Sequence, residues 1–108
     1  HPESPACREE LFGPVATLIE AIDEEEAIRL ANATAYGLGA AVYSRDLERA
    51  EAIARDRLEA GSAFVNAFVR SDPRLPFGGT KASGWGRELG REGLLAFTHA
   101  KTVWMARG

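Results

Sequence analysis

Few side chains in this sequence have a type and spacing that could support covalent chemistry. Cys7 is the one thiol, and the adjacent Arg8 could favour its reactive thiolate form. It lies in a proline-rich stretch with no histidine nearby except His1, which favours a structural thiol over a nucleophile. His99 is expected to face solvent between a helix and a strand. No pair of histidines or cysteines has metal-ligand spacing, and no serine lies in a GxSxG motif, so we expect neither a metal site nor a nucleophile elbow.

Two adjacent carboxylates, Glu9 and Glu10, are candidate binding groups. They could form a solvated surface pair, as most exposed carboxylates do. Alternatively, Phe12, Gly13 and Pro14 could fix the following backbone and hold one carboxylate beside a strand. A carboxylate held in this way can accept hydrogen bonds from a sugar diol, as acidic residues do in dinucleotide sites. The local sequence leaves both interpretations open.

The segment 76–90, PFGGTKASGWGRELG, contains five of the eleven glycines in the chain. Glycine permits positive φ angles and close backbone approach, but each glycine loses much conformational entropy on folding. The segment lacks the GxxxxGK[ST] motif of a phosphate loop, and Gly84, Gly86 and Gly90 miss the GxGxxG spacing by one residue. We therefore predict that another chain segment or a ligand approaches the backbone here. We call residues 76–90 the glycine loop.

The amino-terminal half contains the first elements that could position these groups. Residues 1–14 hold three prolines and are predicted to be extended, and the apolar segment 15–22 is predicted to be a strand. Asp23 followed by Glu26 resembles a capping box and predicts a helix of about ten residues. Residues 38–44 form a second predicted strand.

The second half continues the alternation of strands and helices. Asp46 is expected to cap a helix that runs to about Leu58, because apolar residues recur there at helical spacing. A strand is predicted at 62–67, a short helix at 88–98 and a last strand at 101–106. Such alternation is typical of βαβ units with a parallel sheet. The residues by themselves therefore predict an α/β half-sheet.

The overall composition narrows the class of protein. With 108 residues, 45% hydrophobic content and a net charge of −3, the chain has the size and composition of one globular domain. The negative charge argues against nucleic acid or anionic lipid as partners. No apolar run approaches the roughly 20 residues of a membrane span, no signal peptide is visible, and cytoplasm is the expected compartment. The missing initiator methionine and the short supply of crossover helices lead us to expect part of a longer protein.

Four motifs together resemble the C-terminal part of the aldehyde dehydrogenase superfamily. They are EELFGPV at 9–15, YGLGAAVYSRD at 36–46, FVNAF at 64–68 and the glycine loop. The sequence RSDPRLPFGG, followed by GREL and a terminal TVW, is most similar to the bacterial succinate-semialdehyde dehydrogenases. The resemblance implies that residues 1–97 form a parallel-sheet βαβαβ portion of the catalytic domain. It also implies that residues 98–108 form an oligomerisation strand and the C-terminus.

The resemblance implies an NAD(P)-dependent oxidation of a small aldehyde to a carboxylic acid. In this family a cysteine thiolate attacks the aldehyde, hydride passes to the nicotinamide, and an activated water hydrolyses the thioester. The choice between NAD and NADP stays open, because the residues that meet the adenosine ribose lie upstream in the family. A homo-oligomer formed through residues 98–107 is also implied.

Individual roles follow from the same resemblance. Glu10 matches the carboxylate that binds the nicotinamide ribose, and Phe12 matches the residue that packs near the nicotinamide. Phe77 matches an aromatic side chain of the substrate tunnel. Ser71 lies where succinate-semialdehyde enzymes place a serine that binds the distal carboxylate of the substrate. Glu88 matches a carboxylate on a proposed proton-exit route.

Arg74 lies with Ser71 on the loop that leads into Phe77. Arg74 either helps Ser71 to hold the distal carboxylate or points to solvent, and the sequence leaves both possibilities open. Asn66 and most glycines are expected to maintain the architecture of strands and loops.

The family's nucleophile, oxyanion asparagine, general-base glutamate and dinucleotide fold lie upstream of the region that this chain resembles. Cys7 matches no family position with a defined role, so the isolated chain is predicted to be inactive. Two other hypotheses remain: a non-enzymatic interaction module that recruits partners by strand addition, and a truncated product. An in-frame GQxC-type segment upstream of His1 would decide for the enzyme.

Overall fold

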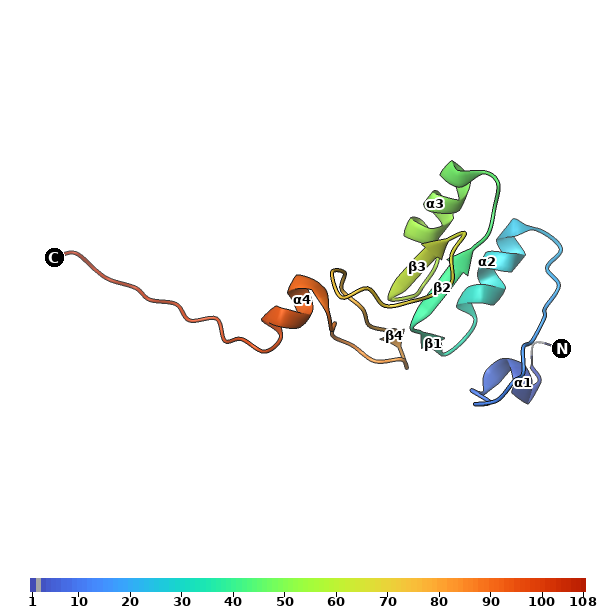
Figure 1. Cartoon of the computed structure of the whole chain (residues 1–108), viewed down its shortest axis with the longest axis horizontal. Coiled ribbons are helices and arrows are strands. Elements are labelled where there is room, and N and C mark those ends of the chain that lie inside the picture. Colours follow the sequence, from blue (N-terminus) through green and yellow to red (C-terminus); the bar gives the residue numbers. More distant parts are fainter. Residues whose placement is uncertain (2) are drawn as a thin grey trace.

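A single parallel βαβ unit forms the centre of the computed structural model, which describes His1 and residues 3–108 (Figure 1). Strands β2 (Gly39–Val42) and β3 (Ser62–Val65) pair in parallel, with Gly39 opposite Ser62. Helix α3 (Leu47–Asp56) connects the two strands and contacts both. The predicted α/β class with a parallel strand pair is therefore confirmed. Both strands end two residues earlier than the sequence pattern indicated.

Both main helices begin at the predicted capping residues. Helix α2 (Glu24–Asn32) follows Asp23, whose side chain accepts a hydrogen bond from the backbone of Glu26 at 2.8 Å. The Glu26 carboxylate in turn accepts from the backbone of Ile22 at 2.9 Å, which completes a reciprocal capping box. Helix α3 follows Asp46, whose side chain accepts from the backbone of Arg49 at 3.0 Å. These caps satisfy amides that have no partner within the helix.

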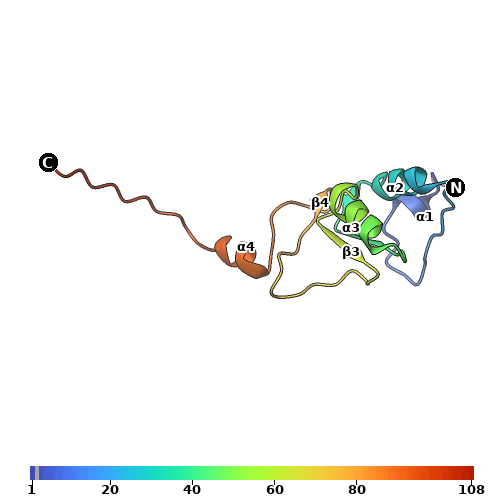
Figure 2. The same ribbon diagram turned by 90° about the horizontal axis from the view of Figure 1, so that it is seen from above.

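Helices α2 and α3 lie side by side next to the β2–β3 pair (Figure 2). Two ion pairs join them, between Glu24 and Arg49 and, at 2.6 Å, between Glu25 and Arg57. The apolar residues buried between these elements are Ile28, Ala50 and Ile53. All residues of the two strands retain some exposure. A parallel sheet is normally covered by helices on both faces, so this small core leaves strand surface without a partner.

The amino-terminal segment differs from its predicted structure in two places. Residues 1–14 are not uniformly extended, because Pro5–Arg8 form the short helix α1 with proline at its first position, where no amide is needed. The segment 15–22 was predicted to be a strand, but the structure assigns none there and residues 11–20 are all exposed. A strand forms only where a neighbour supplies its backbone partners. Among the described residues, none pairs with this segment.

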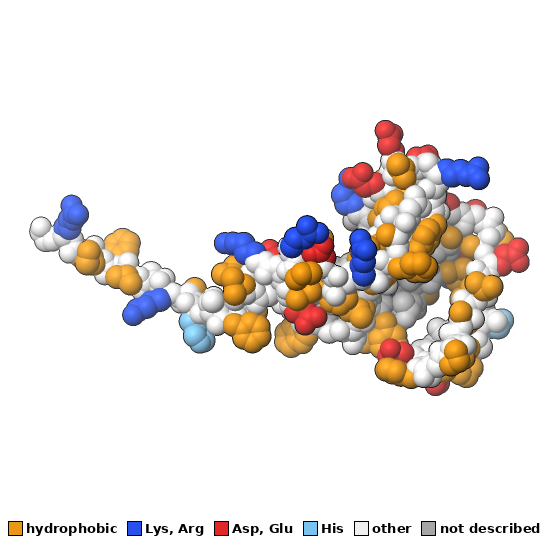
Figure 3. Space-filling model, in the orientation of Figure 1, with side chains coloured by type: hydrophobic (Ala, Val, Ile, Leu, Met, Phe, Trp, Pro, Cys, Tyr) orange, Lys and Arg blue, Asp and Glu red, His pale blue; other side chains and the backbone are white. Residues whose placement is uncertain are grey.

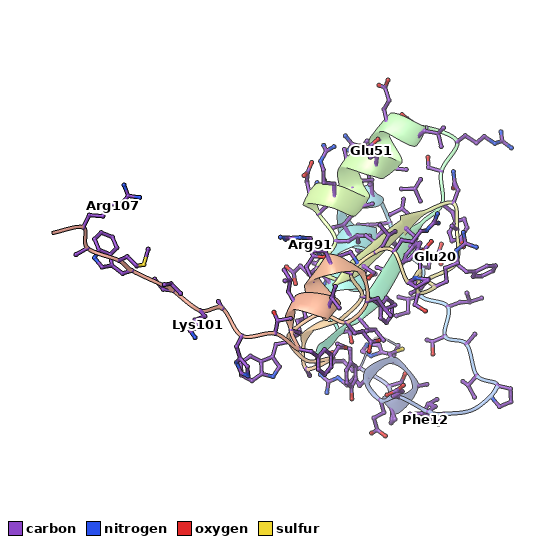
Figure 4. All side chains as sticks on the ribbon, turned by 60° about the vertical axis from the view of Figure 1, so that its left-hand side comes forward. Phe12, Glu20, Glu51, Arg91, Lys101 and Arg107 are labelled. Carbon is purple, nitrogen blue, oxygen red and sulfur yellow. The ribbon has the colours of Figure 1, made fainter. Side chains whose placement is uncertain are left out.

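The carboxyl-terminal segment departs from its prediction for the same reason. The predicted helix at 88–98 is shorter, since α4 spans Gly90–Leu95, and Phe97 is 92% exposed. The structure assigns no strand to residues 101–106. Instead, the tail extends away from the other elements, with Lys101 and Arg107 along it (Figure 4). The predicted last strand therefore does not form within the described chain, where no second strand lies alongside it.

Candidate functional site

The glycine loop docks onto the segment that follows α2 through a short antiparallel ladder. Strand β1 (Tyr36–Gly37) pairs with β4 (Thr80–Lys81), with Tyr36 opposite Lys81. Beyond the ladder, the backbone of Ala82 donates to the carbonyl of Ala35 at 3.0 Å. The Ser83 hydroxyl accepts a hydrogen bond from the backbone of Gly37 at 3.0 Å. This ladder is not predictable from the sequence pattern, because its strands are two residues long and lie far apart in the chain.

Two kinds of glycine occur in this region. Gly84 and Gly86 adopt φ angles of 110° and 89°, which residues with a Cβ rarely adopt. Gly61 instead permits close approach: its amide donates to the carbonyl of Gly37 at 2.9 Å, and a Cβ on it would overlap the carbonyl oxygen of Gly78. The prediction that a chain segment approaches the backbone of the glycine loop is therefore confirmed. The approaching residue, Gly61, directly precedes β3.

The base of the glycine loop holds two predicted site residues next to each other. Phe77 and Glu88 exchange both backbone hydrogen bonds, each at 2.8 Å. The side chain of Phe77 is half-buried, whereas that of Glu88 is exposed. Leu89, the next residue, has φ 61° and ψ 174°, a combination that costs about 1–3 kcal/mol for a residue with a Cβ. The structure thus keeps the Phe77–Glu88 bridge next to a strained turn.

An open pocket of about 530 Å³ lies between the amino-terminal segment and the docked loop. Glu9 and Glu10 line one side of it, and Tyr36 and Ser83 line another. Both carboxylates are exposed, so their oxygens can accept hydrogen bonds from a ligand that carries hydroxyl groups. No sequence pattern indicated Tyr36 and Ser83 as lining residues. Only the β1–β4 ladder brings them beside Glu10.

The sequence profile of the aldehyde dehydrogenase family matches residues 1–103. The chain belongs to this family. It is 52% identical over 102 residues to the succinate-semialdehyde dehydrogenase [NADP(+)] of Deinococcus radiodurans. This match covers 94% of this chain and 21% of that protein. It is 49% identical over 105 residues to the NADP/NAD-dependent aldehyde dehydrogenase PuuC of Escherichia coli, covering 97% and 21% of the two chains.

Solved aldehyde dehydrogenases share the fold of this chain. The crystal structure of Mycobacterium tuberculosis aldehyde dehydrogenase complexed with NAD+ superposes with a TM-score of 0.93 and 38% sequence identity. The superposition covers 100% of this chain and 22% of that one. The chain thus spans about a fifth of the length of the aldehyde dehydrogenases that it matches.

Phe12 does not line the pocket that Glu9 and Glu10 border. Phe12 has a φ of 45°, is 90% exposed and lies at the edge of the molecule near α1 (Figure 4). The structure assigns no strand to residues 15–22, which follow residues 12–14, so the binding role of Glu10 stays a prediction. Glu9 and Glu10 are exposed, which is compatible both with a solvated surface pair and with binding of a ligand.

The contacts of Cys7 agree with a structural thiol. Its sulfur accepts a hydrogen bond from the Ser4 hydroxyl at 3.3 Å and donates to the carbonyl of His1 at 3.4 Å. The guanidinium of Arg8 forms an ion pair with Glu3. Arg8 is therefore engaged by a carboxylate. His99 is exposed, as predicted.

Ser71 lies on the segment that leads into the glycine loop and is exposed to solvent. On the same segment, Arg74 is paired with Asp72. The Arg74 guanidinium donates to both carboxylate oxygens of Asp72, at 2.9 and 2.6 Å. These bonds, together with the Arg74 backbone amide, hold the pKa of the Asp72 carboxyl below its usual value. Because Arg74 already has a carboxylate partner, the geometry favours the alternative in which Ser71 acts without it.

Asn66 has the architectural role expected from the sequence. Its amide donates to the carbonyl of Ser44 at 2.8 Å and accepts from the Ser44 backbone at 2.9 Å. Its own backbone amide donates to the carbonyl of Val42 at 2.8 Å, and its φ angle is 50°. Asn66 thereby closes the ends of β2 and β3 against each other.

A membrane-spanning helix and a cluster of metal ligands are both absent from His1 and residues 3–108. None of the helices combines the length and apolar character of a bilayer-spanning segment. Within the same residues, no group of three histidine, cysteine, aspartate or glutamate side chains could hold a metal ion.

Proposed function

We propose that this chain is the C-terminal part of an NAD(P)-dependent aldehyde dehydrogenase that oxidises a short aldehyde, with succinate semialdehyde as the first candidate. The observation that carries this proposal is the match of nearly the whole chain, at 52% identity, to the succinate-semialdehyde dehydrogenase of Deinococcus radiodurans. Residues 1–97 would belong to the catalytic domain, and residues 98–108 would form the oligomerisation strand and C-terminus. In that larger protein, residues 15–22 and 101–106 would gain the strand partners they lack here.

The pocket between Glu10 and the glycine loop supports the cofactor assignment. The exposed Glu10 carboxylate fits one end of NAD or NADP, because it can accept hydrogen bonds from a ribose diol. The exposed ring of Phe12 offers an apolar surface to the nicotinamide end. When bound, this cofactor supplies the hydride acceptor for aldehyde oxidation.

The bridge at the base of the glycine loop supports the substrate assignment. Phe77 would line the aldehyde tunnel, and the neighbouring Glu88, with its carboxylate exposed, would accept a proton on its way to solvent. Ser71 would hold the distal carboxylate of succinate semialdehyde through its hydroxyl. A hydrogen bond to a charged group contributes about 1.5–3 kcal/mol.

Replacing Ser71 in the intact enzyme tests the substrate assignment. Ser71→Ala removes the donor to the distal carboxylate, so KM for succinate semialdehyde should rise about tenfold, given 1.4 kcal/mol per decade. Steady-state kinetics with butanal, which lacks the carboxylate, should be almost unchanged. Ser71→Thr keeps the hydroxyl and serves as the matched control. Equal losses on both aldehydes would show that the segment shapes the tunnel and does not bind the carboxylate.

The oligomeric role of residues 98–107 leads to a prediction for the isolated chain. Its tail exposes Val103, Trp104 and Met105 to 74, 87 and 81%, and Figure 3 shows hydrophobic side chains along it. Unpaired backbone next to apolar side chains promotes strand pairing between copies. Light scattering should therefore detect dimers or larger species, and the double variant Val103→Glu, Trp104→Glu should reduce them. A clean monomer at high concentration would contradict the proposal.

The uncovered strands favour a second candidate from a different class. A non-enzymatic interaction module could use the exposed surfaces of β2 and β3 and the free tail to recruit another protein. One observation distinguishes the enzyme from the interaction module. An upstream coding segment with a GQxC-type motif, whose product oxidises aldehydes, decides for the enzyme.

A further inference from the structure

One lysine connects the glycine loop to the rest of the fold. The Lys81 ammonium donates to the carbonyl of Asn32 at 2.7 Å and to that of Thr34 at 3.4 Å. It also forms an ion pair with Glu59 at 2.7 Å. The Lys81 side chain is only 25% exposed. The backbone of Lys81 has a φ of 53°, a value that residues other than glycine seldom adopt. This geometry aims a positive charge at three oxygens outside the loop.

The groups that receive Lys81 are themselves held in place. Asn32 is the last residue of α2, where carbonyl oxygens lack a helical partner and attract positive charge. Its side chain donates to the carbonyl of Arg57 at 2.7 Å and accepts from the backbone of Glu59 at 2.9 Å. Asn32 therefore joins the end of α2 to the α3–β3 connection. Lys81 contacts both sides of that junction.

The glycine loop also has an internal brace. The guanidinium of Arg87 donates to the carbonyl of Gly79 at 2.8 Å and to that of Gly86 at 2.6 Å. The backbone bridge between Phe77 and Glu88 closes the base of the same loop. These contacts join residues 77–79 to residues 86–88 across the loop. The position of the loop then depends on the contacts that attach it to its surroundings.

We propose that Lys81 is a positioning residue whose ammonium fixes the glycine loop against the end of α2 and thereby places Phe77 and Glu88. The β1–β4 ladder has only two residues in each strand, and the Thr80 hydroxyl adds hydrogen bonds to the carbonyls of Gly37 and Glu59. Lys81 supplies a cationic contact beside these neutral bonds, and it reaches the end of α2, which they do not. Attachment of the loop follows from the geometry of this chain. The consequence for aldehyde binding rests on the proposed function, and the two parts are tested by separate measurements.

Hydrogen–deuterium exchange in this chain tests the attachment. Lys81→Met removes the charge but keeps the apolar stem, so peptides containing the amides of Gly37 and Ala82 should exchange at least tenfold faster. Peptides from α3, around the buried Ala50, should be unchanged. Lys81→Arg should restore protection, and Arg45→Met, at an exposed residue before α3, serves as the matched loss of charge elsewhere.

A milder variant keeps the test decisive if Lys81→Met unfolds. Glu59→Gln removes one partner of the ammonium and leaves the lysine in place, so it should accelerate the same loop peptides to a smaller degree. Unchanged loop exchange in both variants would overturn the proposal. So would equal acceleration in the loop and in α3 in both variants, because Lys81 would then support the whole fold and not the position of the loop.

Kinetics of the intact enzyme test the consequence for the site. If Lys81 acts through Phe77, Lys81→Met should raise KM for the aldehyde about tenfold, and Lys81→Arg should recover most of the loss. A merely structural role would lower the active fraction, and hence kcat, without changing KM. An unchanged KM despite faster loop exchange would overturn the role in aldehyde binding. Absence of aldehyde oxidation in the unsubstituted enzyme would instead reject the proposed function and leave the exchange result standing.

Discussion

The isolated 108 residues should reduce neither NAD nor NADP with any aldehyde. A dehydrogenase of this family needs an activated thiolate, and Cys7 is the single thiol in the chain. The sulfur of Cys7 is engaged with Ser4 and His1, and the adjacent Arg8 is paired with Glu3. No catalytic base contacts the thiol among these neighbours. The expected result is a complete absence of turnover.

The absorbance of the reduced nicotinamide, followed with succinate semialdehyde and butanal, measures this directly. The intact enzyme is the positive control, and Cys7→Ser is the matched variant of the isolated chain. Turnover that disappears in Cys7→Ser would contradict the assignment of Cys7 as a structural thiol. It would also show that the chain carries a reactive centre of its own.

The second large effect concerns the contact between Gly61, the residue before β3, and the glycine loop. Gly61→Ala should lower the free energy of unfolding by about 2–3 kcal/mol, the upper part of the range for overpacking. The added Cβ would overlap the carbonyl oxygen of Gly78, which is backbone and cannot turn aside as a flexible side chain can. The loop must then lift, and the hydrogen bond from Gly61 to Gly37 weakens with it.

Urea unfolding followed by circular dichroism measures the loss, and Gly13→Ala provides the matched control. A Cβ at Gly13 meets no atom closer than 3.7 Å, so the control should change the free energy of unfolding by less than about 0.5 kcal/mol. Equal midpoints for the two variants would mean that the contact between Gly61 and Gly78 does not limit stability.

The sequence was informative where structure depends on near neighbours. The starts of α2 and α3 follow from Asp23 and Asp46, because a cap acts on amides three residues away. The parallel pairing of β2 and β3 follows from the alternation of strand and helix patterns. Family membership was also visible in the sequence, since four motifs in the right order were sufficient.

The site was less accessible from the sequence, because its contacts join residues that are distant in the chain. Lys81 and Arg87 could be counted as charges in the glycine loop, but their oxygen partners depend on how the loop docks. The pairing of Arg74 with Asp72 left Ser71 as the candidate for the substrate carboxylate. Tyr36 and Ser83 joined the pocket only through the β1–β4 ladder.

The sequence by itself determined helices α2 and α3 with their caps, the parallel strand pair and the family. Only the tertiary structure decided which segments became strands and where the glycine loop lies. Residues 15–22 and 101–106 have strand-like patterns yet form no ladder, whereas Tyr36–Gly37 and Thr80–Lys81 form one without such a pattern. The reason is physical: a helix satisfies its backbone from within, but a strand or a docked loop requires partners that other segments bring into place.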